Sequence, residues 1–265
     1  AAFGIANPVT GDQVAMTNHH WKFSINALRE GLGVSRFLLL NDFTALALSL
    51  TLLPEAQKRQ VGSGTATPNA AIGLIGPGTG LGVSGLFPVG YQNKWIPIAG
   101  EGGHVSLTAT TEHEFTAIQQ LQKRYGHVSA ERVISGAGLV DLYHALCDLK
   151  DGQGREITTP AEVIERAQEV PTSTANEALD MFCGFLGSVA GDLALTLGAR
   201  GGIYIGGGIV PRLAERFDAS PFRERFEAKG RFKKYLQDVP TWVIHSPVSP
   251  ALQGASQALS LTQWQ

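Results

Sequence analysis

The chain has 265 residues, of which 43% are hydrophobic, so it can fold as one large or two ordinary globular domains. Its formal net charge is −2 and no basic run is longer than a pair, which excludes the electrostatic footprint of a nucleic-acid-binding protein. Two cysteines without metal-ligand spacing argue against disulfides and zinc, and no stretch approaches the roughly 20 apolar residues of a membrane span, so we expect a cytoplasmic protein without membrane contact.

The first part of the chain alternates between strand and helix patterns. It opens, without methionine, on residues that read as a strand already under way, and we expect that sequence is missing upstream. The next elements expected are a strand at 14–17, a helix at 24–31 and a strand at 36–40. This order is typical of α/β proteins.

A second block begins after a polar loop at 61–69, and a boundary is plausible near 52–54. Strands are expected at 70–75, 82–89, 94–98, 202–205 and 242–245. Helices are expected at 112–125, 129–135, 138–149, 160–168, 176–198 and 251–261. The start at Thr159-Pro160-Ala161-Glu162 combines a capping box with proline at the first helical position.

The segment 37–46 runs from an apolar strand through Asn41 and Asp42 into a helix. Open α/β sheets bind ligands at the carboxyl ends of their strands, so both side chains are candidates for a site. A partly desolvated carboxylate there can take a proton from a substrate hydroxyl. Taken alone, the segment fits equally well with Asp42 as a helix N-cap.

Two glycine runs are candidates for phosphate or nucleotide binding. In Gly76-Pro77-Gly78-Thr79-Gly80-Leu81-Gly82 the glycines allow close backbone approach to a phosphate, and Thr79 adds a hydroxyl donor. A tight hairpin is the alternative, but it needs only one or two glycines, and no Gly-Lys-Ser/Thr ends the run as in a Walker A loop. The run Gly206-Gly207-Gly208 follows a predicted strand and precedes a proline-initiated helix, which indicates an anion site or close helix packing.

Carboxylates and an imidazole occur in two further glycine bends. Glu101 and His104 are three residues apart, and Glu131 follows Gly126 in the first turn of an expected helix. Every hydroxyl of a sugar is both donor and acceptor, and these side chains with Asn41 supply both functions. Taken alone, His104 also fits a turn histidine and Glu131 a residue that complements a helix dipole.

Together the motifs resemble those of bacterial ATP-dependent glucokinases over essentially the whole chain. The motifs are Asn41-Asp42-Phe43-Thr44-Ala45, residues 76–82, Gly100-Glu101-Gly102-Gly103-His104, Gly126-His127-Val128-Ser129-Ala130-Glu131-Arg132 and residues 206–212, with segments 8–12, 15–19 and 229–233.

The resemblance implies an actin-like, hexokinase-like (ribonuclease H-like) α/β fold of two domains. Residues 1–52 with 244–265 would form a small domain, incomplete at its N-terminus, and residues 53–243 a large one. The implied enzyme is a hexose kinase that uses ATP as its Mg²⁺ complex, binds glucose, has no metal-ligating side chains of its own and forms a homodimer, as similar proteins commonly do.

The resemblance also implies a role for each candidate residue. Asp42 would be the general base for the sugar 6-hydroxyl. The glucose ligands would be Asn41, Asp42, Gly80, Glu101, His104 and Glu131. The ATP ligands would be Gly78, Thr79, Gly80, Gly206, Gly207 and Gly208.

One family feature has no counterpart in this sequence. These glucokinases begin with a strand carrying an Asp-x-Gly-Gly-Thr phosphate loop, which these residues lack. Loss of one preorganised donor costs roughly 10²–10³ in rate. The alternative to a glucokinase is therefore a catalytically inactive sugar-binding remnant of the same fold.

Overall fold

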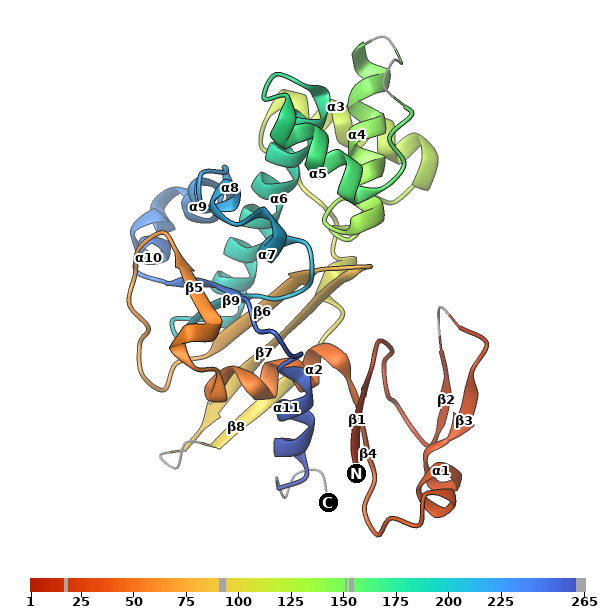
Figure 1. Ribbon diagram of the computed structural model, residues 1–265. Coiled ribbons are helices and arrows are strands. Elements are labelled where there is room, and N and C mark those ends of the chain that lie inside the picture. The colour runs from red at the N-terminus through yellow and green to blue at the C-terminus, as the bar shows by residue number, and fades with distance from the viewer. Residues whose placement is uncertain (17–18, 91–93, 151, 153–154, 261–265) are drawn as a thin grey trace. The chain divides into compact units, whose positions relative to one another are not determined.

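The computed structural model describes residues 1–265 except 17–18, 91–93, 151, 153–154 and 261–265. The chain forms two compact units (Figure 1). The first consists of Ala1–Lys58, Ser84–Gly100 and His245–Gln265, and the second of Arg59–Val83 and Glu101–Ile244. The expected domains, 1–52 with 244–265 and 53–243, stay a prediction.

The first unit is built around two parallel strands, β1 (Ala2–Ile5) and β4 (Leu38–Asn41), with Ala2 opposite Leu38. Helices α2 (Asp42–Ser49) and α11 (Ala251–Ala258) pack on each other and on β1. A Cβ atom at Gly254 would overlap the carbonyl oxygen of Ala45, so only glycine allows this close crossing. The last residue of the helix expected at 251–261 lies outside the described residues.

The same unit contains a small antiparallel ribbon, β2 (Gln13–Ala15) and β3 (Lys22–Ser24), followed by α1 (Ile25–Gly31). Ser24 caps α1 by accepting a hydrogen bond from the backbone N–H of Ala27 at 3.1 Å. The expected strand at 14–17 corresponds to β2. Its last expected residue, Thr17, lies outside the described residues. Strand β3 was not predicted from the sequence, because it is only three residues long.

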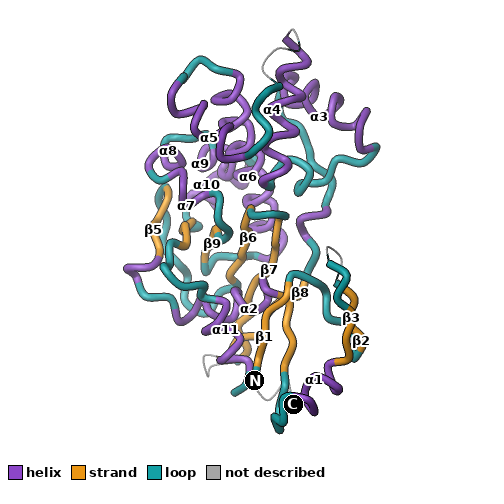
Figure 2. The backbone as a smooth tube through the Cα atoms, turned by 45° about the vertical axis from the view of Figure 1, so that its right-hand side comes forward, coloured by secondary structure: helices purple, strands orange, loops and turns teal. Residues whose placement is uncertain are grey.

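Six strands form the main sheet, in the order β5-β10-β9-β6-β7-β8. Figure 2 labels β5, β9, β6, β7 and β8 of this sheet. Their bounds are Lys58–Val61 (β5), Ile72–Pro77 (β6), Leu81–Val89 (β7), Lys94–Ala99 (β8), Gly202–Ile205 (β9) and Thr241–Ile244 (β10). β6, β9 and β10 are parallel, and β7 and β8 are antiparallel. The carboxyl ends of β6 and β9 therefore lie side by side.

The second unit carries eight helices among its described residues. The longer ones are α3 (Glu112–Tyr125), α4 (Gly136–Lys150), α5 (Pro160–Glu169) and α6 (Thr174–Leu197). The shorter ones are α7 (Val210–Leu213), α8 (Glu215–Asp218), α9 (Phe222–Glu227) and α10 (Lys233–Gln237). The capping box predicted for α5 is present, with Thr159 and Glu162 bonded reciprocally.

Helix α6 is the core of this unit, and α9 packs directly against it. A Cβ atom at Gly187 would overlap the carbonyl oxygen of Phe222, so the absence of a side chain permits the contact. By length and composition alone α6 could cross a membrane, which corrects the statement that no stretch is apolar enough. The protein itself buries 72% of the most apolar stretch, as in a core helix.

The helix expected at 129–135 is wrong. Ser129 instead forms an isolated antiparallel bridge with Ser106. The N–H groups of Ala130 and Glu131 donate to the carbonyls of Val105 and Gly103, both at 2.8 Å. These bonds to a distant segment replace helical bonds, and α4 begins only at Gly136. Strand β5, which ends at the first residue of the loop expected at 61–69, was not predicted. Its four residues show no alternation of apolar and polar side chains that would indicate a strand.

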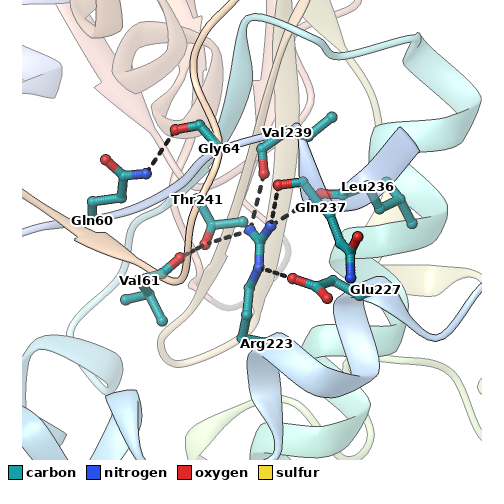
Figure 3. A network of polar contacts seen from close by, with 9 residues as sticks. All are labelled: Gln60, Val61, Gly64, Arg223, Glu227, Leu236, Gln237, Val239 and Thr241. Atoms are coloured by element: carbon teal, nitrogen blue, oxygen red, sulfur yellow. Dashed lines mark hydrogen bonds and ion pairs between the residues drawn. The ribbon is translucent and has the colours of Figure 1, made fainter. Parts of the chain in front are cut away.

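Arg223 ties the end of the second unit together (Figure 3). Its guanidinium donates to the carbonyls of Val239, Leu236 and Gln237 at 2.9–3.1 Å and pairs with Glu227 at 2.7 Å. Thr241 and Val61 extend the network, because the Thr241 hydroxyl donates to the Val61 carbonyl at 2.6 Å. One side chain thus fixes the loop before β10 to α9.

Candidate active site

Asn41 and Asp42 lie at the junction between β4 and α2, as expected. Asn41 has the extended backbone of an N-cap, and its Oδ1 accepts hydrogen bonds from the backbone N–H groups of Phe43 at 3.0 Å and Thr44 at 3.1 Å. The capping role considered for Asp42 therefore belongs to Asn41. Asp42 is the first residue of the helix itself.

The Asp42 carboxylate is half-buried, and only one of its oxygens is engaged. Oδ1 accepts a hydrogen bond from the Phe43 N–H at 2.9 Å, whereas Oδ2 has no partner among the described residues. Burial disfavours the charged form and raises the pKa of Asp42, although hydrogen bonds from backbone N–H groups oppose the shift. A carboxylate with a raised pKa and a free oxygen is suited to accept a proton.

The first glycine run forms a tight turn from β6 into β7. The Gly78 N–H donates to the Gly80 carbonyl at 2.8 Å, and Thr79 at the tip is exposed. The hairpin alternative is thus correct for the backbone, and it is compatible with phosphate binding. A Cβ atom at Gly78 would meet nothing within 4 Å, so there is open space beside this residue.

Glu131 connects this turn to the segment that carries Glu101 and His104. Its Oε2 accepts a hydrogen bond from the backbone N–H of Leu81 at 2.8 Å. Its own N–H donates to the Gly103 carbonyl at 2.8 Å. A Cβ atom at Gly80 would lie 2.5 Å from Glu131 Oε2, so glycine at this position leaves room for the carboxylate. Glu131 is in a turn, which excludes the helix-dipole role considered for it.

Glu101 and His104 flank a short 3-10 turn, Gly102–His104, and the His104 N–H donates to the Glu101 carbonyl at 3.0 Å. Both residues are exposed on the second unit. Gly102 and Gly103 are in close contact with β7, because a Cβ atom on either would overlap Val83 or the Leu81 carbonyl. The glycines therefore hold the turn against the strand that starts beside Glu131.

The second glycine run packs on the first. The Gly206 N–H donates to the Ile75 carbonyl at 2.8 Å, and a Cβ atom at Gly207 would overlap the Pro77 carbonyl. Gly207 also has φ +77°, a conformation that favours glycine. Gly208 is exposed, with nothing within 4 Å of a Cβ atom. Helix α7 is only one turn long, so the dipole at its N-terminus contributes little to anion binding. The backbone N–H groups of the glycine run remain the candidate ligands.

The start of α4 is a part of this site that was not predicted from the sequence. The Gly136 N–H donates to the Gly78 carbonyl at 2.8 Å, and Ser135 Oγ accepts a hydrogen bond from the Gly138 N–H at 3.0 Å. The run Ser135-Gly136-Ala137-Gly138 signals a helix start, but its contact with Gly78 is visible only in three dimensions.

The second unit thus brings together Gly78, Thr79, Gly80, Glu101, His104, Glu131, Gly206, Gly207 and Gly208. Asn41 and Asp42 belong to the first unit. The gathering of all these residues around one sugar stays a prediction. In the part of the chain that the structure describes, no group of three His, Cys, Asp or Glu side chains could hold a metal ion.

Comparisons with known proteins give one consistent family. A family model described as Glucokinase matches residues 1–262. Glucokinase from Chromobacterium violaceum is 54% identical over 260 residues, which cover 98% of this chain and 74% of that protein. The "Bifunctional protein glk" of Paraburkholderia xenovorans is 52% identical, and the match covers 98% of this chain and 40% of that protein.

Solved structures agree. The glucokinase from an Antarctic psychrotroph has a TM-score of 0.86 at 35% identity, covering 97% of this chain and 79% of its own. Glucokinase from Balamuthia mandrillaris, solved in complex with glucose, has a TM-score of 0.80 at 19% identity, and the match covers 98% of this chain and 77% of that one. At this low identity the likeness is evidence for the fold alone. These neighbours confirm the expected actin-like, hexokinase-like α/β fold. The family model and the relatives that match nearly all of these residues show that this chain belongs to the glucokinase family.

Proposed function

We propose that this chain transfers the γ-phosphoryl group of ATP to the 6-hydroxyl of glucose, with Asp42 as the general base. The family makes it an ATP-dependent hexose kinase. The observation that supports this role for Asp42 most directly is its position at the β4–α2 junction, half-buried, with one oxygen held and the other free. As the sugar hydroxyl attacks, this carboxylate accepts its proton, and the negative charge that forms on the sugar oxygen stays small.

For the sugar we propose the ligands Asn41, Asp42, Gly80, Glu101, His104 and Glu131. Glu101 and His104 are exposed and so can be reached by a ligand, and Glu131 is held by the Leu81 N–H. A sugar hydroxyl left unpaired in a closed site costs about 1–3 kcal/mol. A set that mixes carboxylates, an amide and an imidazole avoids that cost for several hydroxyls at once.

For ATP we propose the turn at Gly78, Thr79 and Gly80 and the packed run at Gly206–208. The open space beside Gly78 and Gly208 fits a nucleotide phosphate chain, which close-packed side chains would exclude. Mg²⁺, bound to the phosphates of ATP and to water, would neutralise charge in the transferred group. A glucokinase from Streptomyces griseus was solved with glucose and AMPPNP; at 18% identity and a TM-score of 0.59, it shows the fold alone.

We further propose that the protein is a cytoplasmic homodimer that binds neither nucleic acid nor membranes. This rests on the family and on the small net charge of −2. The alternative of an inactive sugar-binding remnant rests on the lack of an Asp-x-Gly-Gly-Thr loop in these residues, and the family and the relatives do not favour it over an active kinase.

The test is the substitution Asp42→Asn in a coupled assay of ADP release with glucose and other hexoses. We expect kcat to fall by at least about 10²-fold, with glucose binding measured by calorimetry largely retained. Asp192→Asn, which changes an exposed aspartate on α6, is the matched control and should keep wild-type kinetics. An unchanged kcat for Asp42→Asn would show that another group takes the proton.

A further inference from the structure

The turn at Gly78, Thr79 and Gly80 has little of its own that fixes its shape. Thr79 is exposed, and a Cβ atom at Gly78 would meet nothing within 4 Å, so no neighbour packs against this side of the turn. Glycine has more backbone conformations than other residues, and ordering them around a ligand costs entropy. The hydrogen bond from the Gly78 N–H to the Gly80 carbonyl closes the turn at 2.8 Å. Contacts from outside the turn must add to this bond if the turn is to keep one conformation.

Residues 131–136 contact both ends of the turn, and we call this segment the clamp. At one end, Glu131 Oε2 accepts a hydrogen bond from the Leu81 N–H at 2.8 Å. At the other end, the Gly136 N–H donates to the Gly78 carbonyl at 2.8 Å. One short piece of chain therefore bridges the glycine turn.

The clamp is itself firmly held. Val133 and Ile134 are completely buried, and their N–H groups donate to the Ala130 carbonyl at 3.1 and 2.7 Å. Ser135 caps the start of α4, because its Oγ accepts a hydrogen bond from the Gly138 N–H at 3.0 Å. A buried and hydrogen-bonded segment can hold the turn in place before a ligand arrives, which lowers the cost of ordering it on binding.

We infer that Gly136 is a positioning residue: through its N–H, the clamp holds the Gly78 turn in the conformation that receives the phosphates of ATP. This inference rests on the proposed function. It goes beyond that function because Gly136 is not among the proposed ligands of ATP or glucose. It acts only through the Gly78 carbonyl.

A proline at position 136 removes this bond selectively. Gly136 is the first residue of α4, where a helix does not need the N–H and proline is favoured, as Pro160 is in α5. In Gly136→Pro the ring Cδ atom replaces the amide hydrogen, so the Gly78 carbonyl loses its donor and has to move. Gly136→Ala keeps the N–H, and its Cβ atom would lie 3.4 Å from the Gly78 oxygen, an ordinary contact. Thr174→Pro makes the same change at the first residue of α6, behind its Ser173 cap.

The experiment measures kcat, KM for ATP, the calorimetric Kd for glucose and the melting temperature. For Gly136→Pro we expect KM for ATP to rise about 2- to 12-fold, the range of one lost neutral hydrogen bond. We expect kcat to fall by about tenfold or more, because the proposed phosphate ligands move with the turn. The Kd for glucose should stay near wild type, since Glu131 keeps its own bonds. A merely structural role would instead lower the melting temperature and weaken both substrates alike. Gly136→Ala and Thr174→Pro should keep wild-type kinetics.

An unchanged KM for ATP in Gly136→Pro, or an equal rise in Thr174→Pro, would overturn the inference. If Gly136→Pro does not fold, hydrogen exchange on the wild type decides. Binding of AMPPNP should slow exchange of the Gly136 N–H more than that of the Asn176 N–H, which bonds to Ser173 at the start of α6. An equal effect on the two amides would overturn the inference.

Gly78→Leu separates this failure from a failure of the proposed ATP site, because the new side chain would fill the open space beside the turn. A strong rise in KM for ATP in Gly78→Leu, without one in Gly136→Pro, would refute the clamp and leave the proposed site standing. An unchanged KM in both variants would show that the turn does not bind ATP, and both proposals would fall.

Discussion

Replacing Gly80 with alanine tests how the turn controls Glu131. The new Cβ atom would lie 2.5 Å from Glu131 Oε2, and an ordinary contact needs about 3.5 Å, so the carboxylate must move by roughly 1 Å. It is the end of a flexible side chain and can move. The move breaks its bond with the Leu81 N–H, which is now 2.8 Å long. We therefore expect a folded protein with a displaced Glu131.

The structure sets the size of the effect. A hydrogen bond to a charged group contributes about 1.5–3 kcal/mol, and about 1.4 kcal/mol corresponds to a factor of ten. If sugar binding has to restore the position of Glu131, the KM for glucose in Gly80→Ala should rise roughly tenfold to 150-fold. Gly31→Ala is the control, since its Cβ atom would meet nothing within 4 Å. Its KM should equal that of the wild type.

A double-mutant cycle gives the decisive measurement. If the alanine acts only through Glu131, then Gly80→Ala should change KM little in a protein that already carries Glu131→Ala. Steady-state kinetics on the four proteins provide the comparison. Additive effects of the two substitutions, or a wild-type KM for Gly80→Ala alone, would refute the reasoning.

Three further outcomes follow from the packing and the pKa of the site. Burial raises the pKa of Asp42, so the charge of this carboxylate costs stability once the pH is above that raised pKa. Asp42→Asn should therefore have a higher melting temperature than the wild type at about pH 7.5. The difference in melting temperature should close as the pH falls through the raised pKa. An equal gap at about pH 4 would contradict this. Arg223→Met leaves Glu227 and three carbonyls unpaired, so the free energy of unfolding measured in urea should fall by about 3–5 kcal/mol. Arg200→Met changes an exposed arginine and should leave this free energy almost unchanged. Similar urea midpoints for the two variants would contradict the prediction. Gly187→Ala forces α6 away from α9 and should lower the melting temperature strongly. Gly184→Ala should be tolerated, because the nearest atom to its new Cβ would lie 3.7 Å away. Equal melting temperatures of the two variants would contradict this prediction.

The sequence was sufficient where a local signal determines the structure. The bounds of α3 (Glu112–Tyr125) and β9 (Gly202–Ile205) were predicted to the residue, and the start of α5 followed from its capping box. These signals are contained within a few neighbouring residues. The segment around Glu131 failed because its N–H groups bond to Gly103 and Val105, about 25 residues earlier in the chain.

The candidate site shows the same division. Residue types and glycine runs identified the residues that the second unit brings together. The sequence did not show which partner each residue has. That Asn41 and not Asp42 caps α2 depends on one residue of register. That Gly80 is needed to leave room for Glu131, and Gly207 for Pro77, depends on side-by-side packing of distant segments.

The glycine contact between α6 and α9 has a consequence for synthesis of the protein. α6 ends at Leu197 and α9 begins at Phe222, so 24 residues must be made before the partner of this apolar helix exists. At translation speeds of 5–20 residues per second, that delay is about 1–5 s. During that interval the apolar surface of α6 that α9 later covers is exposed and can bind chaperones or other nascent chains. Yield in a host cell should then depend on elongation speed and on holdase supply as much as on the stability of the finished enzyme.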